Sequence, residues 1–189
     1  MSNQVRLPAD LFDFLRDLER NNDREWFAAN KERYEESVRD PALAFIAAIG
    51  PELRKIVPHF QAIPRAQGGS LFRIYRDTRF GKDKTPYKTN TGLHFRHEAG
   101  KDAHAPGFYV HLAPGEVFFG AGLWRPAGEV VLSIRNLIVG DSEAWRQMKE
   151  SIDKGPLSLT GGFMERILGL CAEAVPVMRF LCRAVDVPF

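Results

Sequence analysis

The chain has 189 residues, of which 44% are hydrophobic and 26% are charged, and this composition excludes a disordered or fibrous protein. Its formal net charge of +2 is too small to indicate a nucleic-acid binder by itself, so any anion binding must come from locally clustered cations. No apolar run approaches the roughly 20 residues that span a bilayer, and no export signal opens the sequence. We therefore expect one cytoplasmic domain over residues 1–189, without a membrane span.

Helices are predicted over residues 8–57. Pro8 suits a first helical turn, and apolar residues then follow at helical spacing until Asn21. Asp23 is a suitable N-cap for a second helix, and a third begins at Asp40, which precedes a proline.

The spacing of apolar residues changes between residues 70 and 124, where short aromatic or alternating runs are separated by Gly, Pro and charged residues. This pattern predicts strands. The tripeptide 113–115, Ala-Pro-Gly, is typical of a hairpin turn, so at least the two strands around it should be antiparallel. The four expected strands are 71–75, 93–96, 108–112 and 116–119.

Helices are predicted again over residues 126–185. One runs from Pro126 to Gly140, Asp141 caps the next, and a last apolar helix is broken or kinked at Pro176. Helices, then strands, then helices indicate the α+β class, with a mostly antiparallel sheet packed against N-terminal and C-terminal helices.

The two cysteines, Cys171 and Cys182, lie among apolar residues in the last predicted helical segment. On a continuous helix they are too far apart for a disulfide, so we expect buried free thiols. Free thiols are consistent with a reducing cytoplasm.

The segment 70–90 holds six of the 26 Lys and Arg residues, and its arginines recur every third residue. The arginine fork suits carboxylates and phosphates, and lysines add mobile point charges, so an anion site is chemically reasonable. The alternative is structural: arginines paired with acids, such as Asp77, Glu116 or Glu129 for Arg76, and lysines that keep a loop soluble. The expected ligand-binding residues are Arg73, Arg76, Arg79, Lys84, Tyr87 and Lys88, with the three arginines converging on one concavity.

Two histidines, His94 and His111, fall in predicted strands, and Tyr109 should share a sheet face with His111. His111 paired with Glu116 is a candidate pair for acid–base catalysis. No His or Cys spacing typical of a metal site is present, so no metal and no cofactor are expected.

Several motifs resemble one family. They are 21–27 (NNDREWF), 30–34 (NKERY), 71–80 (LFRIYRDTRF), 82–88 (KDKTPYK), 107–112 (GFYVHL) and 120–124 (GAGLW). Together they are similar to the mainly bacterial family called domain of unknown function 2461, from about residue 8 to the end. The resemblance implies no activity, substrate or cofactor. Relative to similar proteins, the stretch 154–162 is shortened.

The leading hypothesis is therefore a domain that binds a phosphate- or carboxylate-bearing ligand on the basic segment. Single-stranded nucleic-acid binding stays open, because Phe72, Tyr75, Phe80 and Tyr87 are interleaved with the cations. A protein-interaction scaffold without catalysis also stays open. Whether the protein is an enzyme and its oligomeric state are not determined by these patterns.

Overall fold

The computed structural model of the 189-residue chain describes residues 7–79, 82–100, 104–150 and 162–189. Phe80 and most of the stretch 154–162, for which the sequence analysis expects a shortening, lie outside the described residues. The fold is α+β, with helices, then a sheet, then helices, as predicted.

The N-terminal helices are α1 (Asp10–Arg20), α2 (Arg24–Ala29), α3 (Lys31–Tyr34) and α4 (Asp40–Ile56), with a π-helical turn, η1 (Glu35–Arg39), between the last two. The side chain of Asp23 caps α2 by accepting a hydrogen bond of 2.8 Å from the Trp26 N–H, as predicted. The third predicted helix does begin at Asp40, although it continues directly from the π turn.

The sheet has four antiparallel strands in the order β1-β2-β3-β4. They are β1 (Phe60–Gln61), β2 (Thr91–His97), β3 (Gly107–Ala113) and β4 (Glu116–Gly122). Ala113 pairs with Glu116, so Pro114 and Gly115 form the predicted hairpin turn. Gly115 has a φ of 79°, a left-handed conformation that favours glycine at this position of the turn.

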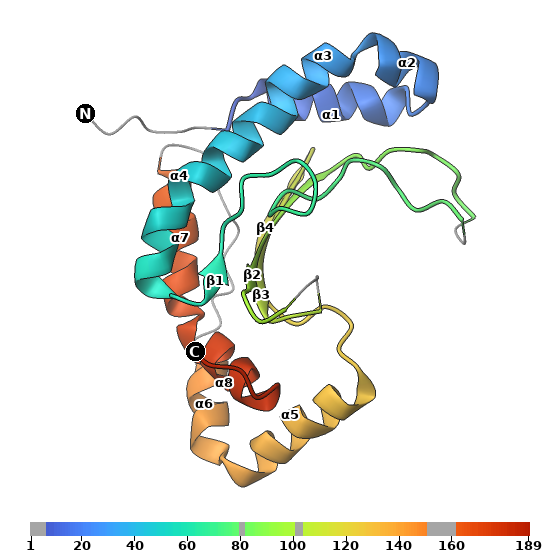
Figure 1. The fold of residues 1–189 in the computed structure, drawn as a ribbon. Coiled ribbons are helices and arrows are strands. Elements are labelled where there is room, and N and C mark those ends of the chain that lie inside the picture. The colour runs from blue at the N-terminus through green and yellow to red at the C-terminus, as the bar shows by residue number, and fades with distance from the viewer. Residues whose placement is uncertain (1–6, 80–81, 101–103, 151–161) are drawn as a thin grey trace.

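The predicted strand 71–75 is wrong as a regular strand. Its first residue, Leu71, makes one bridge to Leu93 of β2, and its last, Tyr75, bridges to Tyr87 instead of to the sheet. The chain leaves the sheet because β2 begins at Thr91, only two residues before Leu93, so the residues after Arg73 run past the end of this strand. Residues 72–79 and 82–90 form a separate projection. We call this projection, visible at the upper right of Figure 1, the arm.

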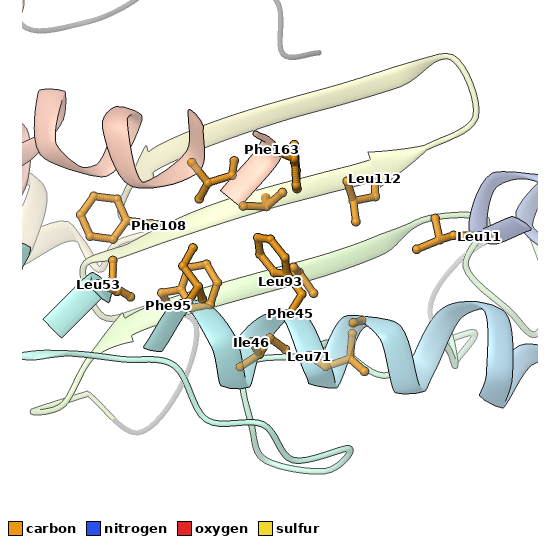
Figure 2. Packing of buried hydrophobic residues seen from close by; sticks show 14 of the residues in the cluster. Leu11, Phe45, Ile46, Leu53, Leu71, Leu93, Phe95, Phe108, Leu112 and Phe163 are labelled. Carbon is orange, nitrogen blue, oxygen red and sulfur yellow. The ribbon is translucent and has the colours of Figure 1, made fainter. Parts of the chain in front are cut away.

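One face of the sheet carries the core. Figure 1 shows α4 and α7 (Phe163–Glu173) lying along this face, and Figure 2 shows apolar side chains filling the space between. Alternate residues of the strands, such as Phe95, Phe108 and Val110, point into it and are fully buried. The helices contribute fully buried side chains to the same core, among them Phe45 and Leu53 of α4.

The C-terminal helices are α5 (Gly128–Gly140), α6 (Ser142–Glu150), α7, and α8 (Val175–Ala184). Asp141 caps α6 through a 3.0 Å bond from the Ala144 N–H, and the expected break near Pro176 separates α7 from α8. Cys171 and Cys182 therefore lie on two helices, and both are buried free thiols as predicted. Burial raises the pKa of the Cys171 thiol to about 12.

Within the described ranges, no helix is long and apolar enough to cross a membrane.

Candidate functional site

The second face of the sheet carries rings instead of aliphatic side chains. Strand alternation places Tyr109 and His111 of β3 on it, and the register sets Phe118 of β4 beside His111 and His94 of β2 beside Tyr109. Phe72, which precedes β2 along the chain, lies next to His94. We call these five residues the aromatic face. Phe72 and Phe118 keep 36% and 41% of their surface exposed, so solvent reaches both ends of the row.

The rings of the aromatic face are in mutual contact. Phe72 stacks on His94 with centroids 5.7 Å apart, and Tyr109 lies 5.9 Å from both Phe72 and Phe118. His111 stacks on Phe118 at 4.6 Å with an interplanar angle of 10°. Two of the five rings, Phe72 and Phe118, are exposed, and exposed aromatic side chains joined in one row make this face a candidate binding surface.

Two glycines make room for this row. A Cβ at residue 92 would lie 2.7 Å from the Tyr109 hydroxyl and 2.9 Å from the Phe72 ring. A Cβ at residue 107 would lie 2.3 Å from Nε2 of His94. These three rings therefore lie against bare backbone, and only glycine at these two positions allows the row to lie so close to the sheet.

Two cations lie at the Phe72 end of the aromatic face. The Lys88 ammonium is 5.5 Å from the centre of the Phe72 ring and donates a 3.0 Å hydrogen bond to the Arg73 carbonyl. Neither Lys88 nor Arg73 has an ion-pair partner among the residues whose placement is described. Burial, and then the Arg73 charge, lower the pKa of Lys88. An incoming anion would relieve this repulsion.

The other arginines of the arm are neutralised locally. Arg76 pairs with Asp83 and Thr85, and not with the acids expected from the sequence. Arg79 pairs with Asp77 at 2.7 Å, and this contact lowers the pKa of Asp77 to about 2. The convergence of Arg73, Arg76 and Arg79 on one concavity stays a prediction. The contacts distinguish Arg73 from the other two, because Arg73 makes no ion pair in the described chain, although its charge helps to lower the pKa of Asp77.

Lys84 and Tyr87, the remaining predicted ligand residues, are both engaged by the arm itself. The Lys84 ammonium donates a 2.8 Å bond to the Thr78 carbonyl. Tyr87 is only 5% exposed and stacks on Phe27 of α2, with centroids 4.0 Å apart. In this structure Tyr87 anchors the arm to the N-terminal helices and offers almost no surface to a ligand.

Asn22 reinforces that anchor. Its amide nitrogen donates to the Tyr87 carbonyl and its amide oxygen accepts from the Tyr87 N–H, both at 3.0 Å. The side chain thus pairs with the arm backbone as a neighbouring strand would. Asn22 lies between α1 and α2, so the helices determine where the base of the arm sits beside the aromatic face.

His111 and Glu116 lie as near each other as the sequence analysis expected, with Nε2 of His111 3.9 Å from a Glu116 carboxylate oxygen. Tyr109 shares the sheet face with His111, as predicted, and its hydroxyl lies 3.0 Å from the His111 Nδ1. Burial lowers the pKa of His111, an effect that Glu116 partly opposes, and burial raises the pKa of Tyr109. Both groups are therefore neutral at pH 7.

We expect His94 to make the fold acid-sensitive. Burial, and then Arg96, lower the pKa of His94 to about 4. The unfolded chain, with an ordinary pKa of about 6.5, takes up a proton first as the pH falls. The contribution of His94 to the free energy of unfolding is therefore fully present above pH 6.5. It falls by on the order of 3 kcal/mol as the pH decreases toward 4. Urea unfolding at several pH values measures the loss.

His94→Phe is the control for this pH dependence. It keeps a ring in place and should have a flatter stability curve between pH 6.5 and 4. Asp77 and Asp83, whose pKa values are held at about 2 by hydrogen bonds, lose their contributions at lower pH in both proteins. Parallel curves for the two proteins would contradict the assignment to His94.

The family model described as "Conserved hypothetical protein (DUF2461)" matches residues 10–162. The chain belongs to this family. The match includes the arm and strands β2 to β4, and it ends before α7, so the expectation that the resemblance reaches the C-terminus was wrong. No curated protein and no solved structure matches this DUF2461 chain at a significant level.

The aromatic face of this DUF2461 protein was only partly visible in the sequence. The sequence patterns indicate Phe72, His94, Tyr109 and His111 and put Tyr109 on one sheet face with His111, but they do not join the four residues into one row, and Phe118 was missed. The hairpin turn at residues 113–115 could have identified Phe118. Once Ala113 is paired with Glu116 across the turn, counting residues outward along both strands pairs His111 with Phe118. Among the residues that the structure describes, no group of three or more His, Cys, Asp and Glu side chains could hold a metal.

Proposed function

We propose that the aromatic face binds a ligand that joins a flat ring to a phosphate or carboxylate group, as a nucleotide does. The observation that carries this proposal is the position of Lys88 over Phe72, where a cation that pairs with no described carboxylate meets the exposed end of a row of rings. Rings on an antiparallel sheet are a general means of holding bases by stacking.

Phosphate fits this end better than a single carboxylate does. Arg73 and Lys88 bring two positive charges together, and a phosphate monoester carries a charge of about −1.5 to −2 at neutral pH. A dianion would neutralise both cations, and the arginine fork would add two parallel hydrogen bonds. The rings would meanwhile bind the base, so one ligand would satisfy both features.

A free nucleotide and a single strand share this chemistry. The net charge of +2 favours a short ligand, because a long polyanion needs many neutralising contacts. Two further cations could contact a single-stranded nucleic acid. They are Arg96, which is half-buried on the same sheet face, and Arg125, which follows β4. Ligand length therefore distinguishes the two sources.

A thermal-shift panel tests the binding. It contains inorganic phosphate, 5′-mononucleotides, and single-stranded oligonucleotides of increasing length. A ligand at 100 times its Kd stabilises by about 2.7 kcal/mol, or roughly 5–11 °C in a protein of this size. We expect a shift with mononucleotides. A shift that grows with every added nucleotide would instead identify a strand as the ligand.

Phe72→Ala and Lys88→Gln should each weaken nucleotide binding. Stacking contributes about 1–3 kcal/mol per base, which is roughly 5- to 150-fold in Kd. Arg79→Gln is the matched control, because it removes an arm cation that already pairs with Asp77. A shift by phosphate alone that survives Phe72→Ala, or no shift with any ligand, would overturn the proposal. The second outcome would favour a protein-interaction scaffold.

We place the protein in the cytoplasm as one domain, as the sequence analysis expected. Two buried free thiols support a reducing compartment. One continuous buried cluster, which includes residues of α1, α4, the sheet, α7 and α8, supports a single domain.

A further inference from the structure

Three side chains of the uncovered sheet face form a line that the binding proposal leaves unexplained. Tyr109 and His111 are two residues apart on β3, and the hairpin turn brings Glu116, the first residue of β4, back beside them. The Tyr109 hydroxyl is 3.0 Å from Nδ1 of His111, and the opposite ring nitrogen, Nε2, is 3.9 Å from the Glu116 carboxylate.

The surroundings determine which way the imidazole faces. Phe118 stacks on one side of the ring at 4.6 Å, and His111 keeps only 16% of its side chain exposed. A hydroxyl beside a neutral imidazole can donate its proton to the unprotonated nitrogen. With Nδ1 accepting from Tyr109, the proton of the neutral ring is on Nε2, which faces the carboxylate.

The geometry points to a proton relay from Tyr109 to His111, supported by the negative charge of Glu116, with the Tyr109 hydroxyl as the group that exchanges a proton with a bound ligand. Tyr109 lies in the middle of the aromatic face, 5.9 Å from the rings of both Phe72 and Phe118. Its hydroxyl would therefore be beside a ligand that stacks on these rings. The role in catalysis rests on the binding proposed above, but the relay itself can be measured without a ligand.

The chemical step is an acid–base transfer without oxidation or reduction. A hydroxyl of the ligand, or a water molecule, loses its proton to the Tyr109 oxygen as the proton of Tyr109 moves to Nδ1 of His111. The imidazolium that results faces the negative charge of Glu116, which stabilises it. The reverse transfer returns the proton to a leaving group. A carboxylate, an imidazole and a hydroxyl in this order are the arrangement that activates a hydroxyl in hydrolases.

Gly92 gives this line a structural condition. A Cβ at residue 92 would be only 2.7 Å from the Tyr109 hydroxyl, which is closer than real Cβ contacts. A methyl group there would therefore push the hydroxyl away from its position. Gly120 faces the same side of the sheet from β4, but a Cβ there would meet nothing within 4 Å. Gly92→Ala and Gly120→Ala are therefore matched variants, one that displaces the relay and one that does not.

The groups in contact with His111 are few in the described chain. Tyr109 on its own strand and Glu116 on β4 are the titratable ones, while Gly92 from β2 and Phe118 from β4 carry no charge. Burial lowers the pKa of His111. The relay should consequently be ready to accept a proton at neutral pH.

The test is acetylation of tyrosines by N-acetylimidazole, located by mass spectrometry after digestion and followed from pH 5 to pH 11. The tyrosine oxygen bonds to the acetyl carbon, the carbon–nitrogen bond breaks, and imidazole leaves with the proton. Tyr75, which is 53% exposed, is the internal control, because its rate should not follow the protonation of His111. The rate for Tyr109 should instead rise as His111 loses its proton, below pH 6.5.

His111→Gln should abolish this early rise and return Tyr109 to a profile like that of Tyr75, with a loss of about 100-fold or more at pH 7. Gly92→Ala should do the same, Gly120→Ala should not, and circular dichroism confirms that each variant is folded. Equal profiles for Tyr109 and Tyr75 in the wild type would overturn the relay. So would a Tyr109 profile that His111→Gln leaves unchanged. Neither result depends on nucleotide binding. Failure of the relay can therefore be told apart from failure of the proposed ligand binding.

Discussion

Phe108→Ala should lower the free energy of unfolding by about 3–5 kcal/mol, the largest loss that we expect from a single substitution in the sheet. Phe108 is fully buried on the core face of β3, with the ring of Phe60 5.0 Å away and that of Phe119 5.9 Å away. Truncation leaves a cavity that the packed helices cannot close. Urea unfolding followed by circular dichroism measures the change.

Phe118→Ala is the matched control for that experiment. It removes the same ring from the neighbouring strand, but on the uncovered face, where Phe118 is 41% exposed. We expect a loss below about 1 kcal/mol. Similar losses for both variants would mean that the second face is also covered, which would remove the structural basis of the proposed binding site.

Phe27→Ala should release the arm. Phe27 is 4% exposed and provides the surface on which Tyr87 stacks at 4.0 Å. We expect a loss of about 3–5 kcal/mol in unfolding free energy, together with faster hydrogen exchange at the Arg76 and Lys88 amides. These two amides bond to the Pro86 and Ile74 carbonyls and hold the arm together. Exchange in β3 should stay slow if only the arm opens.

Two further variants separate packing from anchoring at this contact. Phe27→Leu retains most of the apolar volume and should cost less than about 1.5 kcal/mol. Asn22→Ala removes both hydrogen bonds to the Tyr87 backbone but leaves the stacked rings in place. Arm exchange that stays slow in Phe27→Ala would show that the arm is held by contacts other than this anchor.

Local patterns were sufficient to predict most of the fold. The Asp23 and Asp141 caps, the proline–glycine turn and the proline between α7 and α8 each act over a few residues, and each prediction was confirmed. The segment 71–75 has a strand pattern too. Whether such a pattern continues in a sheet depends on where the partner strand ends, and β2 begins at Thr91, only two residues before the partner of Leu71.

The candidate site was harder to predict for a related reason. A cluster of cations in sequence says nothing about which of them already have partners. Asp83 and Asp77 neutralise Arg76 and Arg79 within the arm, whereas Arg73 and Lys88 meet no carboxylate in the described chain. The aromatic face combines residues from positions 72 to 118, and only the strand register brings them together.

The end of the family match at residue 162 has a practical consequence for anyone who expresses this protein in pieces. The next residue, Phe163, packs on Phe45 with ring centroids 5.5 Å apart, and Ile167 and Cys171 are fully buried in the same core. Nε2 of the buried His97 lies 2.7 Å from the Pro188 carbonyl. A fragment trimmed to residues 10–162 would thus expose one wall of its own interior. The end of the family match at residue 162 is therefore not the end of a unit that could fold by itself.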